Sequence, residues 1–150
     1  MKRALRYSKC VLKRSDYYDL PKKETEILVV NRIGELGLWY KLAFISFIGN
    51  SLNFKEIKTG KNPFEALQAS SIVIHGPKMN EPGYEKPALL GISDIVENKN
   101  DISRAVVKYS IADRRKEKIK RGQELIQGNK AITKNLIAYI SEIYKTRVFK

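Results

Sequence analysis

The stretch DISRAVVKYSIADRRKEKIKRGQELIQG, residues 101–128, combines a dense positive charge with a repeating apolar pattern. Asn100 and Asp101 are residue types that favour the position before a helix, and Gly128 is a type that favours the position after one. Apolar residues follow a spacing of three and four between them, broken only at Lys116 and Gln123: Ile102, Ala105, Tyr109, Ala112, Ile119 and Ile126. The pattern predicts one long helix over residues 101–128 with an apolar stripe.

The basic side chains of this helix are expected to point away from the apolar stripe, where they could contact phosphates. The candidate residues are Arg104, Lys108, Arg114, Arg115, Lys118 and Arg121. The alternative is a solvated face, in which Asp113 pairs with Lys116 and Glu117 pairs with Lys120 or Arg121 at helical spacing. The charge run by itself leaves both interpretations open.

A second helix is expected after a short link at residues 127–130. Asn129 is a suitable capping residue, and apolar residues follow at helical spacing: Ile132, Leu136, Ile140, Ile143 and Tyr144. Because a short link places consecutive helices side by side in opposite directions, we predict a C-terminal antiparallel helix hairpin over residues 101–148.

The sequence before residue 101 mixes helix and strand signals. Pro21 followed by two glutamates predicts a helix over residues 21–33, although the β-branched run at 27–30 fits a buried strand. Residues 36–48 are apolar nearly all round and predict a core helix. The run Asn62-Pro63-Phe64-Glu65 predicts the start of a short helix over 63–69.

Residues 71–75 read as the best strand in the chain, and the Gly- and Pro-rich residues 76–88 as a loop. Residues 89–98 predict another short helix, which together with the basic helix has the outline of a helix-turn-helix. The turn lacks the usual glycine, and Asn100 falls where an apolar residue is expected. We therefore favour a chance outline over a DNA-reading motif.

These signals predict a mainly α (α+β) fold. A chain of 150 residues fits one domain with a real core. We expect a single compact helical domain over residues 21–150, with a small β element, preceded by a basic N-terminal arm or edge strand over residues 1–20. Four residues of that arm are further candidates for phosphate contact: Arg3, Arg6, Lys13 and Arg14.

The net charge of +13 is concentrated at the two ends of the chain. Residues 1–23 carry +6 and residues 102–150 carry +9, whereas residues 24–101 carry −2. Such charge attracts phosphate polyanions and anionic membrane surfaces. The charge distribution therefore favours a polyanionic partner.

Several kinds of chemistry lack the residues they need. Cys10 is the only cysteine and His75 the only histidine, so neither an intrachain disulfide nor structural zinc is expected, and no cofactor is predicted. The E-x-K tripeptides at Glu56 and Glu97 have the form used by metal-dependent nucleases, but two such tripeptides are expected by chance in so lysine-rich a chain. A nuclease stays the less favoured enzymatic alternative.

The sequence thus predicts a non-enzymatic protein that binds DNA or RNA through its basic helix and N-terminal arm. A composition rich in Ile and Lys suggests viral or mobile-element coding. The alternative is a structural, matrix-like assembly protein that binds an anionic membrane or an acidic partner, with homo-oligomers possible in either case. No run is apolar enough for a signal peptide or membrane span, so we expect an intracellular location.

Overall fold

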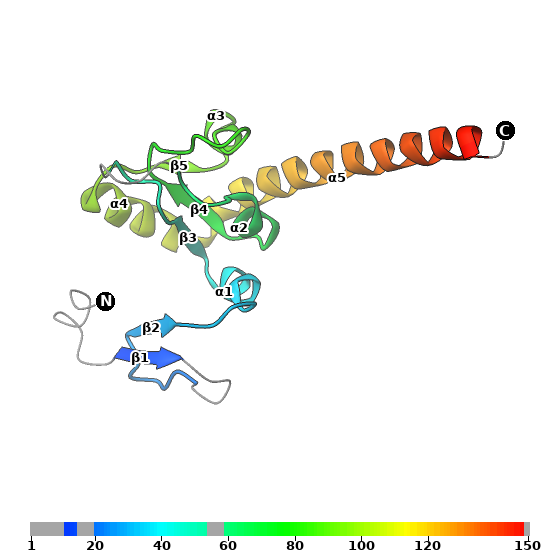
Figure 1. Cartoon of the computed structure of the whole chain (residues 1–150). Coiled ribbons are helices and arrows are strands. Elements are labelled where there is room, and N and C mark those ends of the chain that lie inside the picture. The colour runs from blue at the N-terminus through cyan, green and yellow to red at the C-terminus, as the bar shows by residue number, and fades with distance from the viewer. Residues whose placement is uncertain (1–10, 15–19, 54–58, 149–150) are drawn as a thin grey trace. The chain divides into compact units, whose positions relative to one another are not determined.

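A computed structural model describes residues 11–14, 20–53 and 59–148 of the chain, and for residues 11–14 and 145–148 it describes the backbone alone. The chain divides into two compact units, Met1–Leu36 and Gly37–Lys150. Figure 1 shows the elements of each unit. The predicted arm at residues 1–20 falls largely outside the described residues, so its limits stay a prediction.

The first unit contains a pair of parallel strands. Strand β1 (Val11–Arg14) pairs with β2 (Ile27–Val30), with Val11 opposite Ile27. The helix predicted over residues 21–33 is therefore wrong, and the strand that rivalled it is present. Ile27, Val29 and Val30 decide this, because β-branched side chains fit a pleated strand better than a helix.

The second unit is built on a parallel sheet in the order β3-β4-β5. Its strands are β3 (Ile45–Ile48), β4 (Ile72–His75) and β5 (Asp94–Ile95). In the register of the sheet, Ile45 lies opposite Ile72 and Ile74 lies opposite Asp94. Helix α1 (Leu36–Leu42) precedes β3. Helix α2 (Phe64–Gln68) lies between β3 and β4, and α3 (Lys86–Leu89) lies between β4 and β5. Helices α4 (Lys99–Ser110) and α5 (Ala112–Val148) follow β5.

Two apolar clusters cover the two faces of the central strand β4, whose four residues are all buried. Val73 points into one cluster with residues of β3, α2, α5 and the segments on either side of α3, namely Ile48, Ala66, Leu67, Met79, Ile92 and Ile126. Ile72 and Ile74 point into the other with Val96, Ala105 and Tyr109. Successive residues of a strand face opposite sides, so a strand covered on both sides needs a continuous apolar run.

The helix-rich α+β class is confirmed, and so are the strand at residues 71–75 and the helix starting near Pro63. The core helix predicted over 36–48 is wrong in its second half, where β3 begins at Ile45. A short, fully apolar run fits a buried parallel strand as well as a buried helix, so periodicity could not separate them. The helix predicted over 89–98 is also wrong, because β5 occupies that region and removes the helix-turn-helix outline.

The predicted basic helix over residues 101–128 is divided at Ile111, whose backbone is extended. Asn98 and Asp101 form a capping box at the start of α4. Helix α5 then runs through Gly128 and Asn129 without a turn, so the hairpin link predicted at residues 127–130 is wrong (Figure 1). Among the described residues no helix combines the length and apolarity that crossing a membrane requires.

Gly128 provides a test of the continuous α5. A Cβ added at Gly128 meets nothing within 4 Å, so Gly128→Ala should raise helix content and stabilise the helix by roughly 0.5–1 kcal/mol. At Gly122 the same Cβ would lie 3.3 Å from Leu67, so Gly122→Ala should lack this benefit. Circular dichroism and denaturant unfolding would measure both. A loss of helix in Gly128→Ala would indicate that the helix ends there.

Candidate functional site

The parallel sheet brings the carboxyl ends of its three strands to one edge. Residues 49–53 follow β3, residues 76–85 follow β4, and residues 96–98 follow β5. Helix α2 also begins at this edge, because it belongs to the connection between β3 and β4. In open sheets of this kind, ligands bind outside the carboxyl ends of the strands.

Backbone hydrogen bonds tie three of these segments together. The N–H of Lys61 donates to the Gly49 carbonyl oxygen at 3.1 Å, and the N–H of Gly60 donates to the Lys78 carbonyl oxygen at 2.7 Å. The N–H of Lys78 in turn donates to the Ser51 carbonyl oxygen at 2.9 Å. We call residues 49–52, 59–62 and 76–80 the carboxyl-edge loops. They form one connected surface although they come from distant parts of the sequence.

Ser51 and Gly76 make the closest contact within these loops. The Ser51 side chain is fully buried; its hydroxyl donates to the Ile48 carbonyl oxygen and accepts from the Gly76 N–H at 2.7 Å. A Cβ on Gly76 would lie 2.1 Å from the Ser51 carbonyl oxygen. Only glycine allows the two backbones to approach this closely.

A pocket of about 510 Å³ opens beside the loop that follows β4. Its volume is in the range of small-molecule sites. Its lining combines the end of β4, the following loop, α3 and the end of β5: His75, Pro77, Met79, Asn80, Glu81, Pro82, Glu85, Ala88, Leu89 and Ile95. The pocket therefore offers an apolar lining with carboxylate and amide groups that can orient a polar ligand.

The start of α2 is held by a side chain of the neighbouring loop. Asn62 Oδ1 accepts from the Phe64 N–H at 3.0 Å, and the Asn62 amide donates to Glu65 at 3.3 Å. Glu65 is exposed, and burial together with the charge of Glu65 raises the pKa of Tyr40 above its ordinary value. The carboxylate of Glu65 is thus fixed at the beginning of α2 and available to a ligand.

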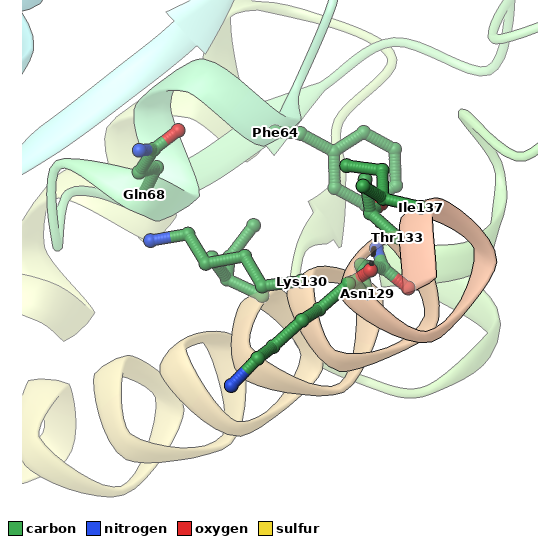
Figure 2. Close-up of a pocket in the computed structure, with 8 residues that line it drawn as sticks. Phe64, Gln68, Asn129, Lys130, Thr133 and Ile137 are labelled. Carbon is green, nitrogen blue, oxygen red and sulfur yellow. Dashed lines mark hydrogen bonds between the residues drawn. The ribbon is translucent and has the colours of Figure 1, made fainter. Parts of the chain in front are cut away.

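A second pocket, of about 500 Å³, lies between α2 and α5 (Figure 2). Phe64 and Ile137 contribute apolar surface, while Gln68, Asn129, Lys130 and Thr133 contribute polar groups. Its lining contains no residue from the loops that follow the strands. It is therefore a feature of helix packing and separate from the carboxyl edge.

Most of the selected basic residues whose side chains the structure describes are engaged in contacts within the chain. Asp94, in β5, accepts hydrogen bonds from Lys108 at 3.1 Å, from the Tyr109 hydroxyl at 2.6 Å and from Lys118. Burial raises the pKa of Asp94, but the hydrogen bonds from Lys118, Tyr109 and Lys108 outweigh it, and the pKa falls below its ordinary value. These two lysines thus join α4 and α5 to the sheet.

Arginine side chains serve similar internal contacts. Arg115 donates to the Tyr109 and Ser110 carbonyl oxygens at the end of α4, and Arg121 donates to the Leu90 carbonyl oxygen. Arg104 forms an ion pair with Asp101, and Arg114 is exposed. Arg3 and Arg6 lie outside the described residues, as do the side chains of Lys13 and Arg14.

The nuclease candidates do not assemble into a described metal site. Glu56 lies outside the described residues, and the Glu97 N–H donates to Asp101 at 3.0 Å beside the capping box. Within the described part of the chain, no three side chains of His, Cys, Asp or Glu cluster in a way that could hold a metal ion.

Sequence reasoning missed the carboxyl-edge loops. The sequence shows glycine at positions 60 and 76, and it predicts a strand over residues 71–75 followed by a loop. The signal that could have pointed to the site was the position of Gly76 directly after a buried strand. Its contact with Ser51 could not be read from the sequence, because the partner is 25 residues away.

Substitution of Gly76 tests how tightly the loops are packed. Gly76→Ala should lower the free energy of unfolding by about 1–3 kcal/mol or more, because the added Cβ overlaps backbone atoms of Ser51. Gly49→Ala is a matched control at the same edge, since a Cβ there meets nothing within 4 Å. Denaturant unfolding would compare the two variants. Equal stability would contradict the contact.

Asp94 predicts a pH dependence. Its folded-state pKa is lowered, so its stabilisation is present above the ordinary value of 3.8 and is lost as the pH falls through the lower folded-state value. Asp94→Asn should therefore destabilise the protein at neutral pH, by about 1–3 kcal/mol. The difference from the unsubstituted chain should shrink as the pH falls below 3.8. Chemical denaturation at several pH values would measure it; a difference independent of pH would contradict the charge network.

Comparison with known proteins identifies similar sequences. No family model matches the chain. It is 44% identical over 63 residues to the 3-deoxy-D-manno-octulosonic acid transferase of Rickettsia typhi, and 43% identical over 63 residues to that of Rickettsia prowazekii. Each match covers 42% of this chain and 13% of the relative. The chain therefore matches only a small part of these enzymes.

A solved structure shares the fold. The C-terminal CMP-Kdo binding domain of WaaA from Acinetobacter baumannii matches with a TM-score of 0.65 and 19% identity, over 79% of this chain and 61% of that domain's chain. At this identity the likeness establishes the fold.

The comparisons correct the functional predictions. Similarity to bacterial transferases contradicts a nucleic-acid-binding, viral or matrix-like protein, and the prediction of a non-enzymatic role is wrong for the same reason. The predicted partners, nucleic acid foremost, are contradicted by the same comparisons. The physical reason is that much of the charge we assigned to phosphates is used in contacts within the fold. The intracellular location stays a prediction.

Proposed function

We propose that this chain shares the function of the matching part of 3-deoxy-D-manno-octulosonic acid transferases and binds CMP-Kdo at its carboxyl-edge loops. The observation that carries the proposal is the 44% identity over 63 residues to the Rickettsia typhi enzyme. The likeness of the fold to a CMP-Kdo binding domain, over 79% of this chain, supports the same ligand. Because the chain spans only 13% of the first relatives, the proposal is confined to binding of the sugar nucleotide.

The geometry of the second unit agrees with this position for the ligand. The strands are parallel, and the loops that follow β3 and β4 are joined to the loop before α2. Gly60 and Gly76 allow these loops to pack closely, since a Cβ at either position would overlap its neighbours. A nucleotide at this edge would meet a preorganised surface, which lowers the entropy cost of binding.

The side chains at this edge match the chemistry of the ligand. CMP-Kdo carries a phosphate and a sugar carboxylate, which are both anionic, together with hydroxyl groups and a cytosine. Lys61 is exposed and Lys78 is half-buried, and both belong to the carboxyl-edge loops, where they bring positive charge to the anions. Glu65, Glu81 and Glu85 are exposed carboxylates that can accept hydrogen bonds from hydroxyl or amino groups.

Binding of CMP and CMP-Kdo to the purified chain tests the proposal. Isothermal titration calorimetry should show saturable binding of both ligands. Lys61→Ala and Lys78→Ala should weaken it about tenfold or more, because a hydrogen bond to a charged group contributes about 1.5–3 kcal/mol. Lys120→Ala, an exposed lysine of α5, is the control with the same change of charge and should bind normally.

Two results would contradict the proposal. The first is the absence of binding to a chain shown by circular dichroism to be folded. The second is binding that Lys120→Ala weakens as much as Lys61→Ala and Lys78→Ala do, because the ligand would then respond to overall charge and have no site at the carboxyl edge.

A further inference from the structure

A row of buried hydrogen bonds joins the segments that follow β3 and β4 to the residue that precedes β5 in the second unit. After β3, the Ser51 hydroxyl donates to Ile48 and accepts from the Gly76 N–H at 2.7 Å. At the end of β4, Nδ1 of His75 lies 2.7 Å from the Gly76 carbonyl oxygen. Nε2 of the same ring lies 3.0 Å from the hydroxyl of Ser93, which directly precedes β5. His75 is thus the central member of a polar row that joins three segments.

The partners of the ring define its protonation. The Gly76 carbonyl oxygen only accepts hydrogen bonds, so Nδ1 of His75 carries the hydrogen. Burial lowers the pKa of His75, while the bond to Gly76 and the charge of Asp94 raise it less, so the pKa lies below its ordinary value. The ring is therefore neutral near pH 7, and its Nε2 accepts from the Ser93 hydroxyl.

The His75 ring lines the pocket of about 510 Å³ beside the loop that follows β4. His75 lines the pocket together with Pro77 and Met79 of the loop that follows β4. The acidic residues Glu81 and Glu85 line the same pocket, and the charge of Asp94 in β5 also acts on the ring. The bond from Nδ1 fixes the carbonyl of Gly76, the first residue of this loop.

Packing alone does not account for a histidine at this position. His75 is 1% exposed, and an imidazole buried to this extent costs free energy unless its nitrogen atoms are hydrogen-bonded. An apolar side chain could fill the space without any such requirement. The two hydrogen bonds therefore fix the orientation of the ring, because one nitrogen binds the loop at Gly76 and the other binds Ser93.

We propose that His75 is a positioning residue for the sugar nucleotide: its Nδ1–H bond to Gly76 holds residues 76–80 in the conformation that accepts the ligand. This inference rests on the proposed function, because it concerns the same site. The ring acts through the loop backbone and takes no part in bond making or breaking.

Three substitutions of His75 distinguish positioning from packing. Asparagine places an amide N–H close to the position of Nδ1 and keeps a donor toward Gly76, whereas glutamine places its amide near Nε2. Phenylalanine fills the space and keeps neither bond. We expect His75→Asn to bind CMP within about threefold of the unsubstituted chain. His75→Gln and His75→Phe should bind about tenfold more weakly, the size of effect expected for one lost hydrogen bond.

The single histidine also gives a direct spectroscopic measurement. A protein labelled with ¹⁵N in histidine yields the resonances of one imidazole, which should report the neutral form with hydrogen on Nδ1. Amide resonances of residues 76–80 should stay close to their original positions in His75→Asn and move in His75→Gln and His75→Phe. Circular dichroism and thermal unfolding would establish that each variant is folded.

The outcomes separate this inference from the proposed function. If the unsubstituted chain does not bind CMP, the proposed function is contradicted. The role of His75 in positioning a nucleotide is then contradicted as well, even if the amide resonances show that His75 orders the loop. If the chain binds CMP and all three variants bind equally well, the proposed function stands and the inference is overturned. A ring with hydrogen on Nε2 alone would also overturn it.

Discussion

The close approach of Ser51 to Gly76 is the contact on which the carboxyl edge of the sheet depends. It joins the segments that follow β3 and β4 through a buried hydroxyl, and it requires a residue without a Cβ at position 76. The same backbone continues to Lys78, which links Ser51 to Gly60 before α2. Residues that are far apart in the sequence therefore form one surface, and the proposed ligand site uses that surface.

Much of the positive charge that the composition assigns to an external polyanion is used for contacts within the chain. Lys108 and Lys118 neutralise Asp94, and Arg115 and Arg121 donate to backbone carbonyl groups of other segments. A charge engaged in this way holds α4 and α5 against the sheet and is less available to an external polyanion. Net charge predicts attraction in solution, whereas the partner depends on which side chains the fold leaves accessible.

Local signals predicted some elements of the fold and failed for others. The Asn62–Glu65 helix start and the strand at 71–75 were predicted because each is encoded within a few neighbouring residues. The two-residue strand β5 has no such local signal and exists only because it pairs with β4. The site depends on contacts between residues that are far apart in the sequence, because the side chain of His75 reaches Ser93 only after the sheet has formed. The sequence alone therefore indicated the class of fold but did not point to the carboxyl-edge loops.

The most direct test of the account is to map CMP onto the protein by the chemical-shift changes of its backbone amides during a titration. The account predicts that the changes concentrate in residues 49–52, 59–62 and 76–80, with the basic segment of α5 at residues 114–121 little affected. Changes confined to α5, or spread evenly over exposed lysines, would contradict a nucleotide site at the carboxyl edge of the sheet.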